Sequence, residues 1–177
     1  MKIIGIHGRA RSGKDTLARF LVDHHGFHRV ALADPLREFV SAITGIPYEA
    51  LVDGPAKEEP LSWLNDRSPR YMMQTLGTEW GRQMVDDQLW LKVAHRRVEE
   101  ARKQGYAGVV IPDVRFDNEA EFVSDLGGTV VEVVRPGVAA VAAHSSEAGV
   151  SPDLIHFTVH NDGTLLDLAR YAETLAL

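Results

Sequence analysis

The chain begins with an apolar run of strand length, a short loop that contains two glycines, and an amphipathic helical segment. The run is "KIIGIH" at 2–7 and the loop is "GRARSGK" at 8–14, after which Leu17, Phe20 and Leu21 share one helical face. A strand that leads through such a loop into a helix is the opening of a βαβ unit. This feature constrains the fold most, because it requires a sheet that is covered by helices.

Four more apolar runs of strand length follow, and segments with helical periodicity separate them. The runs are "HRVALA" at 28–33, "GVVIPD" at 108–113, "TVVEVV" at 129–134 and "IHFTVH" at 155–160. This alternation predicts a three-layer α/β/α fold with a parallel five-stranded sheet. Gly26, Gly105 and the pair Gly127-Gly128 stand where helices should end, as left-handed caps require.

The length of 177 residues, with 45% in the hydrophobic class, allows one full core, so we expect a single domain over residues 1–177. Residues 46–70 differ from the rest, because they contain four prolines and little periodicity. Long loops of this kind in compact domains are usually functional or disordered. We therefore expect a substrate-binding insertion or flap at about 46–85.

Composition excludes several classes of function. A net charge of −6 argues against sequence-independent binding to a nucleic-acid polymer, which needs clustered Lys and Arg. The absence of cysteine removes disulfides, thiol catalysis and Cys-ligated zinc, and the scattered histidines lack metal-ligand spacing. No apolar stretch approaches the roughly 20 residues needed to span a bilayer, and no export signal is evident. We expect a cytoplasmic protein that binds no membrane.

The opening loop has the pattern G-x-x-x-x-G-K of a phosphate-binding loop. Backbone N–H groups and the helix N-terminus would surround phosphate oxygens, and the lysine would reach the β- and γ-phosphates. The predicted nucleotide-binding residues of the loop are Gly8, Arg11, Ser12, Gly13 and Lys14. The alternative is an ordinary glycine turn with a solvated lysine.

Asp15 stands where such loops usually carry a serine or threonine that helps to hold Mg²⁺. A carboxylate is also a hard oxygen ligand, so Asp15 could bind Mg²⁺ directly or through water, while Thr16 would face the α-phosphate. An acid in the first helical turn could instead serve the helix dipole alone. Asp113, which closes an apolar strand, is the second predicted magnesium residue; the alternative is a turn residue.

Seven motifs spread over nearly the whole chain resemble those of deoxynucleoside monophosphate kinases of the bacteriophage type. The motifs are "SGKDT" at 12–16, "ADPLRE" at 33–38, "MQTLGTEWGR" at 73–82, "LWLKVA" at 89–94, "IPDVRFDNEAE" at 111–121, "VVRPG" at 133–137 and "NDGTL" at 161–165. The resemblance implies a P-loop kinase fold that moves the γ-phosphoryl group of ATP, with Mg²⁺, to a deoxynucleoside monophosphate. It also implies that GKDT in place of GK[ST] is usual in the family, and that a phage-encoded member acts in the host cytoplasm. Base specificity and oligomeric state stay open, with a homodimer as one option.

A phosphate acceptor needs concentrated positive charge rather than a general base, because its attacking oxygen is already ionised. Arginines occur in the segments that should edge the site, and each could bind a phosphate with two hydrogen bonds. These are Arg37, Arg67, Arg70, Arg82 and Arg115. Arg82 and Arg115 lie inside the family-like motifs, so we predict that they act with Lys14 in catalysis; the alternative is that any one arginine is an ordinary surface residue.

Asp34 precedes Pro35 at the start of a helical segment, which an N-cap followed by proline would explain. It also follows the second strand, at the edge where open α/β sheets bind ligands. We predict that Asp34 faces the acceptor, as a substrate-binding and catalytic residue.

The base of the acceptor could be recognised by two further residues. Gln74 is predicted to bind base edges. Trp80 could stack on the base, although Met73, Leu76 and Trp80 share a helical spacing that favours core packing.

On the ATP side, the resemblance implies that Asn161 contacts adenine, and the alternative is a simple turn. "HSSE" at 144–147 would cap a helix, but the segment 137–153 contains no arginine for a lid. Arg135 is therefore the predicted basic residue on the ATP side.

Two other functions compete with this interpretation. One is a kinase similar to dephospho-coenzyme A kinase, in which Asp34 would be the base for a hydroxyl acceptor. The other is a nucleotide-binding regulator without an acceptor. The arginine-rich motifs weigh against the first.

Overall fold

The computed structural model describes residues 1–52, 54–137 and 149–177, which form two compact units. The first unit combines Met1–Ala31 with Ala94–Leu177, and the second is Leu32–Val93. The chain returns from the second unit to the first within helix α5 (Leu89–Lys103). The expected insertion at 46–85 falls inside the second unit. Within the described ranges, no helix has the length and apolar character needed to cross a membrane.

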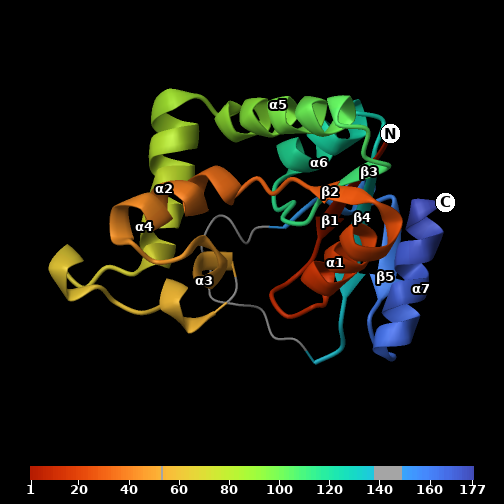
Figure 1. The fold of residues 1–177 in the computed structure, drawn as a ribbon, viewed down its shortest axis with the longest axis horizontal. Helices are drawn as coiled ribbons and strands as arrows, with labels where there is room; N and C mark the ends of the chain where they lie inside the picture. The colour runs from red at the N-terminus through yellow and green to blue at the C-terminus, as the bar shows by residue number, and fades with distance from the viewer. Residues whose placement is uncertain (53, 138–148) are drawn as a thin grey trace. The chain divides into compact units, whose positions relative to one another are not determined.

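The first unit is built on a parallel five-stranded sheet in the order β2-β3-β1-β4-β5 (Figure 1). The strands are β1 (Lys2–His7), β2 (Phe27–Arg29), β3 (Gly108–Ile111), β4 (Thr129–Val134) and β5 (Phe157–His160). The predicted fold class is thus confirmed. The predicted bounds hold for β1 and β4, whereas β2 is much shorter than the predicted run at 28–33.

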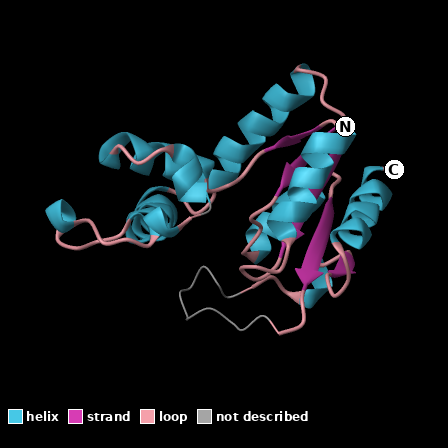
Figure 2. Cartoon of the chain, turned by 60° about the horizontal axis from the view of Figure 1, so that its bottom comes forward, coloured by secondary structure: helices cyan, strands magenta, loops and turns pink. Residues whose placement is uncertain are grey.

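Helices cover both faces of this sheet (Figure 2). Ile4 and Ile6 of β1 belong to the core formed with α1 (Lys14–His25) and α7 (Leu165–Ala176). On the other face, α6 (Asp117–Asp125) packs so closely that a Cβ atom on Gly5 would lie 2.7 Å from a methyl group of Val123. Burial on both faces explains the continuous apolar run of β1, since a covered parallel strand has no solvent face.

The second unit consists of helices and loops. Its helices are α2 (Asp34–Thr44), α3 (Tyr48–Val52), η1 (Pro55–Lys57), η2 (Ser62–Leu64), α4 (Pro69–Thr75) and the π-helix η3 (Leu76–Val85), and the first unit adds the short helix η5 (Pro152–Leu154). Gly45 ends α2 in the left-handed conformation, with φ of 73°. The proline-rich segment therefore folds into short helical turns joined by loops.

Candidate nucleotide-binding site

The loop between β1 and α1 has an unusual backbone. Gly8, Arg11 and Gly13 have φ values of 149°, 65° and 101°. The Ser12 N–H donates to the Arg9 carbonyl at 3.1 Å, which closes a tight turn inside the loop. Alternation of left- and right-handed residues makes successive N–H groups converge, and such concave backbone segments bind anions. The N-terminus of α1 adds its partial positive charge at the same place.

Both glycines of the motif are required by space as well as by conformation. A Cβ atom on Gly8 would lie 2.6 Å from the Val133 carbonyl oxygen and 2.8 Å from Ser12 Oγ. A Cβ atom on Gly13 would lie 2.2 Å from Asn161 Nδ2. A side chain at either position would therefore collide with its neighbours, so this loop conformation requires glycine at both places.

Lys14 begins α1, and its ammonium group lies 2.7 Å from a carboxylate oxygen of Asp15. The Asp15 side chain is 74% exposed, so this ion pair is weak and can open at little cost. Thr16 follows on the next helical position and is half-buried. A lysine at this place can thus change its partner from a carboxylate to a phosphate.

The carboxyl ends of parallel strands lie at one edge of a sheet, and open α/β proteins bind their ligands at this edge. At this edge lie Gly8 after β1, Asp113 and Arg115 after β3, Arg135 after β4, and Asn161 after β5. The predicted residues of the first unit are thereby brought to the same edge from four separate strands.

The segment after β3 is held by two residues that the sequence analysis did not single out. Glu119 is buried and accepts from the Arg115 N–H at 2.6 Å and the Phe116 N–H at 3.2 Å. The His7 ring Nδ1 lies 2.9 Å from the Val114 carbonyl oxygen, which ties the end of β1 to this segment. Glu119 could have been found, because it is the third residue of α6 and acids there often cap the helix start; His7 offers no such signal.

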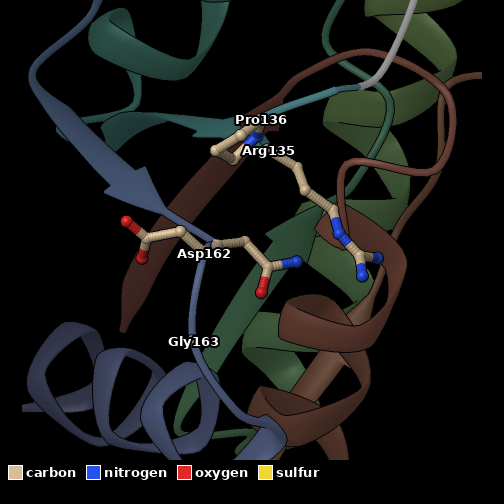
Figure 3. Close-up of a pocket in the computed structure, with 5 residues that line it drawn as sticks. Arg135, Pro136, Asp162 and Gly163 are labelled. Atoms are coloured by element: carbon tan, nitrogen blue, oxygen red, sulfur yellow. The ribbon is translucent and has the colours of Figure 1, made fainter.

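A cavity of about 170 Å³ adjoins the same edge (Figure 3). It is lined by Arg135, Pro136, Asn161, Asp162 and Gly163. Figure 3 shows the Arg135 side chain and the Asp162 carboxylate extending to opposite sides. Asn161 belongs both to this cavity and to the wall of the phosphate loop, since its Nδ2 donates to the Ser12 carbonyl at 2.7 Å. The "HSSE" segment at 144–147 lies outside the described residues.

Asp34, in the second unit, does not cap α2. The capping position is Ala33, and Asp34 is the first residue of the helix, so the predicted N-cap is wrong. The carboxylate is used elsewhere: its Oδ1 accepts from Arg37 at 2.8 Å and from the Tyr48 hydroxyl at 2.5 Å. This cluster is largely buried, and no sequence signal identified Tyr48 as part of it.

The other predicted arginines of the second unit also have local partners. The Arg67 guanidinium lies over the Tyr71 ring, 4.4 Å from its centroid. Arg70 Nε donates to Glu58 at 2.6 Å. Gln74 on α4 and Arg82 on the π-helix are half-buried.

The expectation that Trp80 packs in the core is wrong. Trp80 is 46% exposed, whereas Trp90 is only 8% exposed and donates through its indole N–H to the Gly77 carbonyl at 2.8 Å. Gly81 makes room for the buried ring, because a Cβ atom there would lie 2.6 Å from Trp90. The physical reason is the π-helix, whose i to i+5 hydrogen bonds place Trp80 differently from the assumed α-helical spacing.

The residues at the sheet edge fit a magnesium ion. Among the described residues, no group of three or more His, Asp or Glu side chains is placed to hold a metal. Mg²⁺ in phosphoryl-transfer enzymes needs fewer, since it is usually bound by one or two carboxylates together with phosphates and water. Asp15 and Asp113 are hard oxygen donors that follow the neighbouring strands β1 and β3.

A parallel α/β sheet with a phosphate-binding loop after its central strand defines the class of P-loop proteins, which includes the P-loop kinases. A family model for deoxynucleotide monophosphate kinases matches residues 56–171, and the chain belongs to this family. It is 33% identical over 162 residues to an Acanthamoeba polyphaga mimivirus protein that is provisionally named as such a kinase, with 83% of this chain and 81% of that one covered. In an alignment 231 positions long it is 25% identical to the deoxynucleotide monophosphate kinase of Enterobacteria phage T4, with 95% of each chain covered.

The fold is also found among solved structures. The crystal structure of TT1252 from Thermus thermophilus matches with a TM-score of 0.55 and 18% identity, over 98% of this chain and 95% of that chain. At this identity the likeness concerns the fold alone.

Proposed function

We propose that the chain phosphorylates deoxynucleoside 5′-monophosphates to diphosphates, with ATP as donor and Mg²⁺ as cofactor. The observation that carries the proposal is the preformed phosphate loop at 8–14, located at the ligand-binding edge of the sheet in a member of this kinase family.

The donor is bound by the first unit. Backbone N–H groups of the loop hold the β-phosphate, and Lys14 leaves Asp15 to contact the γ-phosphate. The cavity that contains Arg135 and Asn161 receives the adenosine part of ATP. Asp15 and Asp113 would hold Mg²⁺, which would supply positive charge next to the transferred phosphoryl group.

The acceptor is bound by arginines, because two polyanions must be brought together and the transition state spreads negative charge over the phosphoryl oxygens. In this proposal Arg37, Arg67, Arg70 and Arg82 of the second unit bind the acceptor, and Arg115 of the first unit neutralises phosphate charge at the edge of the sheet. The Arg70–Glu58 ion pair is partly exposed, so Arg70 can exchange the carboxylate for a phosphate at little cost.

A hydroxyl acceptor is less well supported. It would need Asp34 as a free general base, but Asp34 Oδ1 already accepts hydrogen bonds from Arg37 and Tyr48. This arrangement favours a structural or arginine-orienting role for Asp34 over proton abstraction.

Closure of the segment 46–70 on the bound acceptor would exclude water and suppress ATP hydrolysis. Arg67→Ala should then raise the KM for the acceptor and leave ATP binding unchanged. Loss of ATP binding in this variant would contradict the assignment of Arg67.

The direct test is ADP release from Mg-ATP by the purified protein. The acceptor panel contains dGMP, dTMP, dCMP, dAMP, their ribonucleotide counterparts and dephospho-coenzyme A. We expect turnover with one or more deoxynucleotides, abolished by Lys14→Ala and retained by Lys103→Ala on the exposed part of α5. Turnover only with dephospho-coenzyme A, or with no acceptor, would reject the proposal in favour of the hydroxyl kinase or the regulator.

A further inference from the structure

Asn161 connects parts of the first unit that are far apart in the sequence. Its backbone N–H donates to the Val134 carbonyl at the end of β4, at 2.8 Å. Its side-chain Nδ2 donates to the Ser12 carbonyl in the phosphate loop, at 2.7 Å. The backbone bond fixes the base of the side chain, so the amide is presented to the loop from a rigid support.

The bond to Ser12 controls the direction of a loop N–H group. In a trans peptide the carbonyl and the following N–H point in opposite directions. Because Asn161 holds the Ser12 carbonyl, it also fixes where the Gly13 N–H points. Ser12 is only 1% exposed, and its Oγ has no hydrogen-bond partner among the described residues. The hydroxyl therefore adds no second hydrogen bond that would fix this peptide.

Close packing of Asn161 against Gly13 further restrains the orientation of the Ser12–Gly13 peptide. The Asn161 amide occupies the space beside Gly13, where a Cβ atom would lie 2.2 Å from Nδ2. The peptide between Ser12 and Gly13 therefore cannot rotate toward β5 without displacing Asn161. The same side chain lines the cavity assigned to the nucleoside part of ATP.

We propose that Asn161 is a positioning residue of the phosphate loop, which orients the Ser12–Gly13 peptide for phosphate binding in addition to lining the cavity. The inference rests on the proposed donor site and deepens it. It differs from a simple base contact, because it requires Asn161 to affect ligands that have no base.

Isothermal titration with Mg-ATP and with Mg-tripolyphosphate separates the two roles, since tripolyphosphate contains no nucleoside. The variants are Asn161→Ala and Asn161→Leu, the second of which keeps a similar side-chain volume without a donor. Gln104→Ala is the matched control, because it removes an exposed amide that lies outside this cavity. We expect both Asn161 variants to weaken both ligands by about tenfold, as loss of one hydrogen bond allows, and the control to bind tripolyphosphate like the wild type.

Weaker binding of ATP with unchanged binding of tripolyphosphate would overturn the inference and leave Asn161 as a base contact. Failure of the wild-type protein to bind either ligand would instead reject the donor site itself.

Amide hydrogen exchange without ligand gives an independent readout. The N–H groups of Ser12 and Leu17 are bonded to Arg9 and Gly13, at 3.1 and 3.0 Å. They should exchange faster in Asn161→Ala, while the amides of β1 stay unchanged. Equal exchange rates in variant and wild type would also overturn the positioning role.

Discussion

The proposed phosphate loop and the proposed acceptor arginines of the second unit represent two ways of building an anion site. The loop uses backbone N–H groups whose directions are set by left-handed residues, by close contacts at Gly8 and Gly13, and by Asn161. The arginines use side chains, and several are paired within their own unit: Arg37 with Asp34, Arg70 with Glu58, and Arg67 with Tyr71. A backbone site is complete before the ligand arrives, whereas a paired side chain must first change its partner.

This difference predicts how each region responds to substitution. Changes in the loop should remove function abruptly, because the backbone has no alternative conformation that preserves the N–H directions. Changes among the arginines should be graded according to the burial of each pair.

The largest effect is expected for Gly13→Ala. The residue has φ of 101°, and its Cβ atom would lie 2.2 Å from Asn161 Nδ2. Strain of roughly 1–3 kcal/mol at such a position corresponds to a loss of about 100-fold at its upper end. We expect kcat/KM for ATP to fall by about that factor, as measured by initial rates.

Gly127→Ala is the control, since Gly127 has φ of 71° with open space around it; it should lower stability and leave kcat/KM intact. Equal kinetic losses in both variants would show that general destabilisation causes the effect.

Arg37→Ala should have the next largest effect, on stability. The Arg37 and Asp34 side chains are 13% and 9% exposed, so the substitution leaves a nearly buried carboxylate without its cation. We expect a loss of about 2 kcal/mol in the free energy of unfolding, as measured with urea, since the Tyr48 hydroxyl still donates to Asp34. Arg70→Ala, which opens a more exposed pair, should cost less than about 1 kcal/mol. Similar losses in the two variants would remove the distinction between structural and exchangeable arginines.

Tyr48→Phe should have a smaller effect on the same cluster. It removes one hydrogen bond to Asp34 and leaves the Arg37 pair in place. The expected loss of stability is about 1 kcal/mol, measured in the same urea titration. Tyr106→Phe, on a tyrosine that stacks on His28, is the control and should change stability by less than about 0.5 kcal/mol. A loss no greater than the control's would contradict a stabilising role for the Tyr48 hydroxyl.

The smallest effect concerns acid stability. The Thr164 hydroxyl and N–H donate to Asp167 at the start of α7, and they lower the pKa of its carboxyl below the ordinary value of 3.8. A carboxyl with a lowered pKa contributes stability above its unfolded pKa of about 3.9, and this contribution disappears as the pH falls through the lower folded value. The urea midpoint of the wild type should fall between pH 6 and pH 3, and in Asp167→Asn this fall should be smaller. An unchanged difference would show that Asp167 does not contribute.

The sequence predicted the frame of the first unit well, because its signals are local. The apolar run of β1, the glycine loop and the start of α1 lie side by side in the chain, and the bounds of β1 and β4 were correct. The strand predicted at 28–33 was too long at its C-terminal end. Val30, Ala31 and Leu32 lie beyond the end of β2 but are buried, and burial alone does not distinguish a strand from the segment that leads to α2.

Two features of the candidate site could not be predicted in this way. Trp80 was placed by α-helical spacing, and the π-helix changes that spacing without an obvious signal in composition. The contact between Asn161 and Ser12 joins residues 149 positions apart, and neither residue type indicates the other as a partner. Local patterns thus locate the phosphate loop, while its restraint depends on tertiary packing.

The order of the strands has a consequence for synthesis of the protein. β1 is made first, yet its neighbours in the sheet are β3 and β4, which begin at Gly108 and Thr129. During translation the first strand and its loop must therefore wait until β3 and β4 have left the ribosome, and contacts over such sequence separations form slowly. Asn161 reaches the loop later still. A nascent chain that ends before β5 lacks the residue that we propose to orient the Gly13 N–H, so full affinity for a nucleotide is acquired only after β5 has been made.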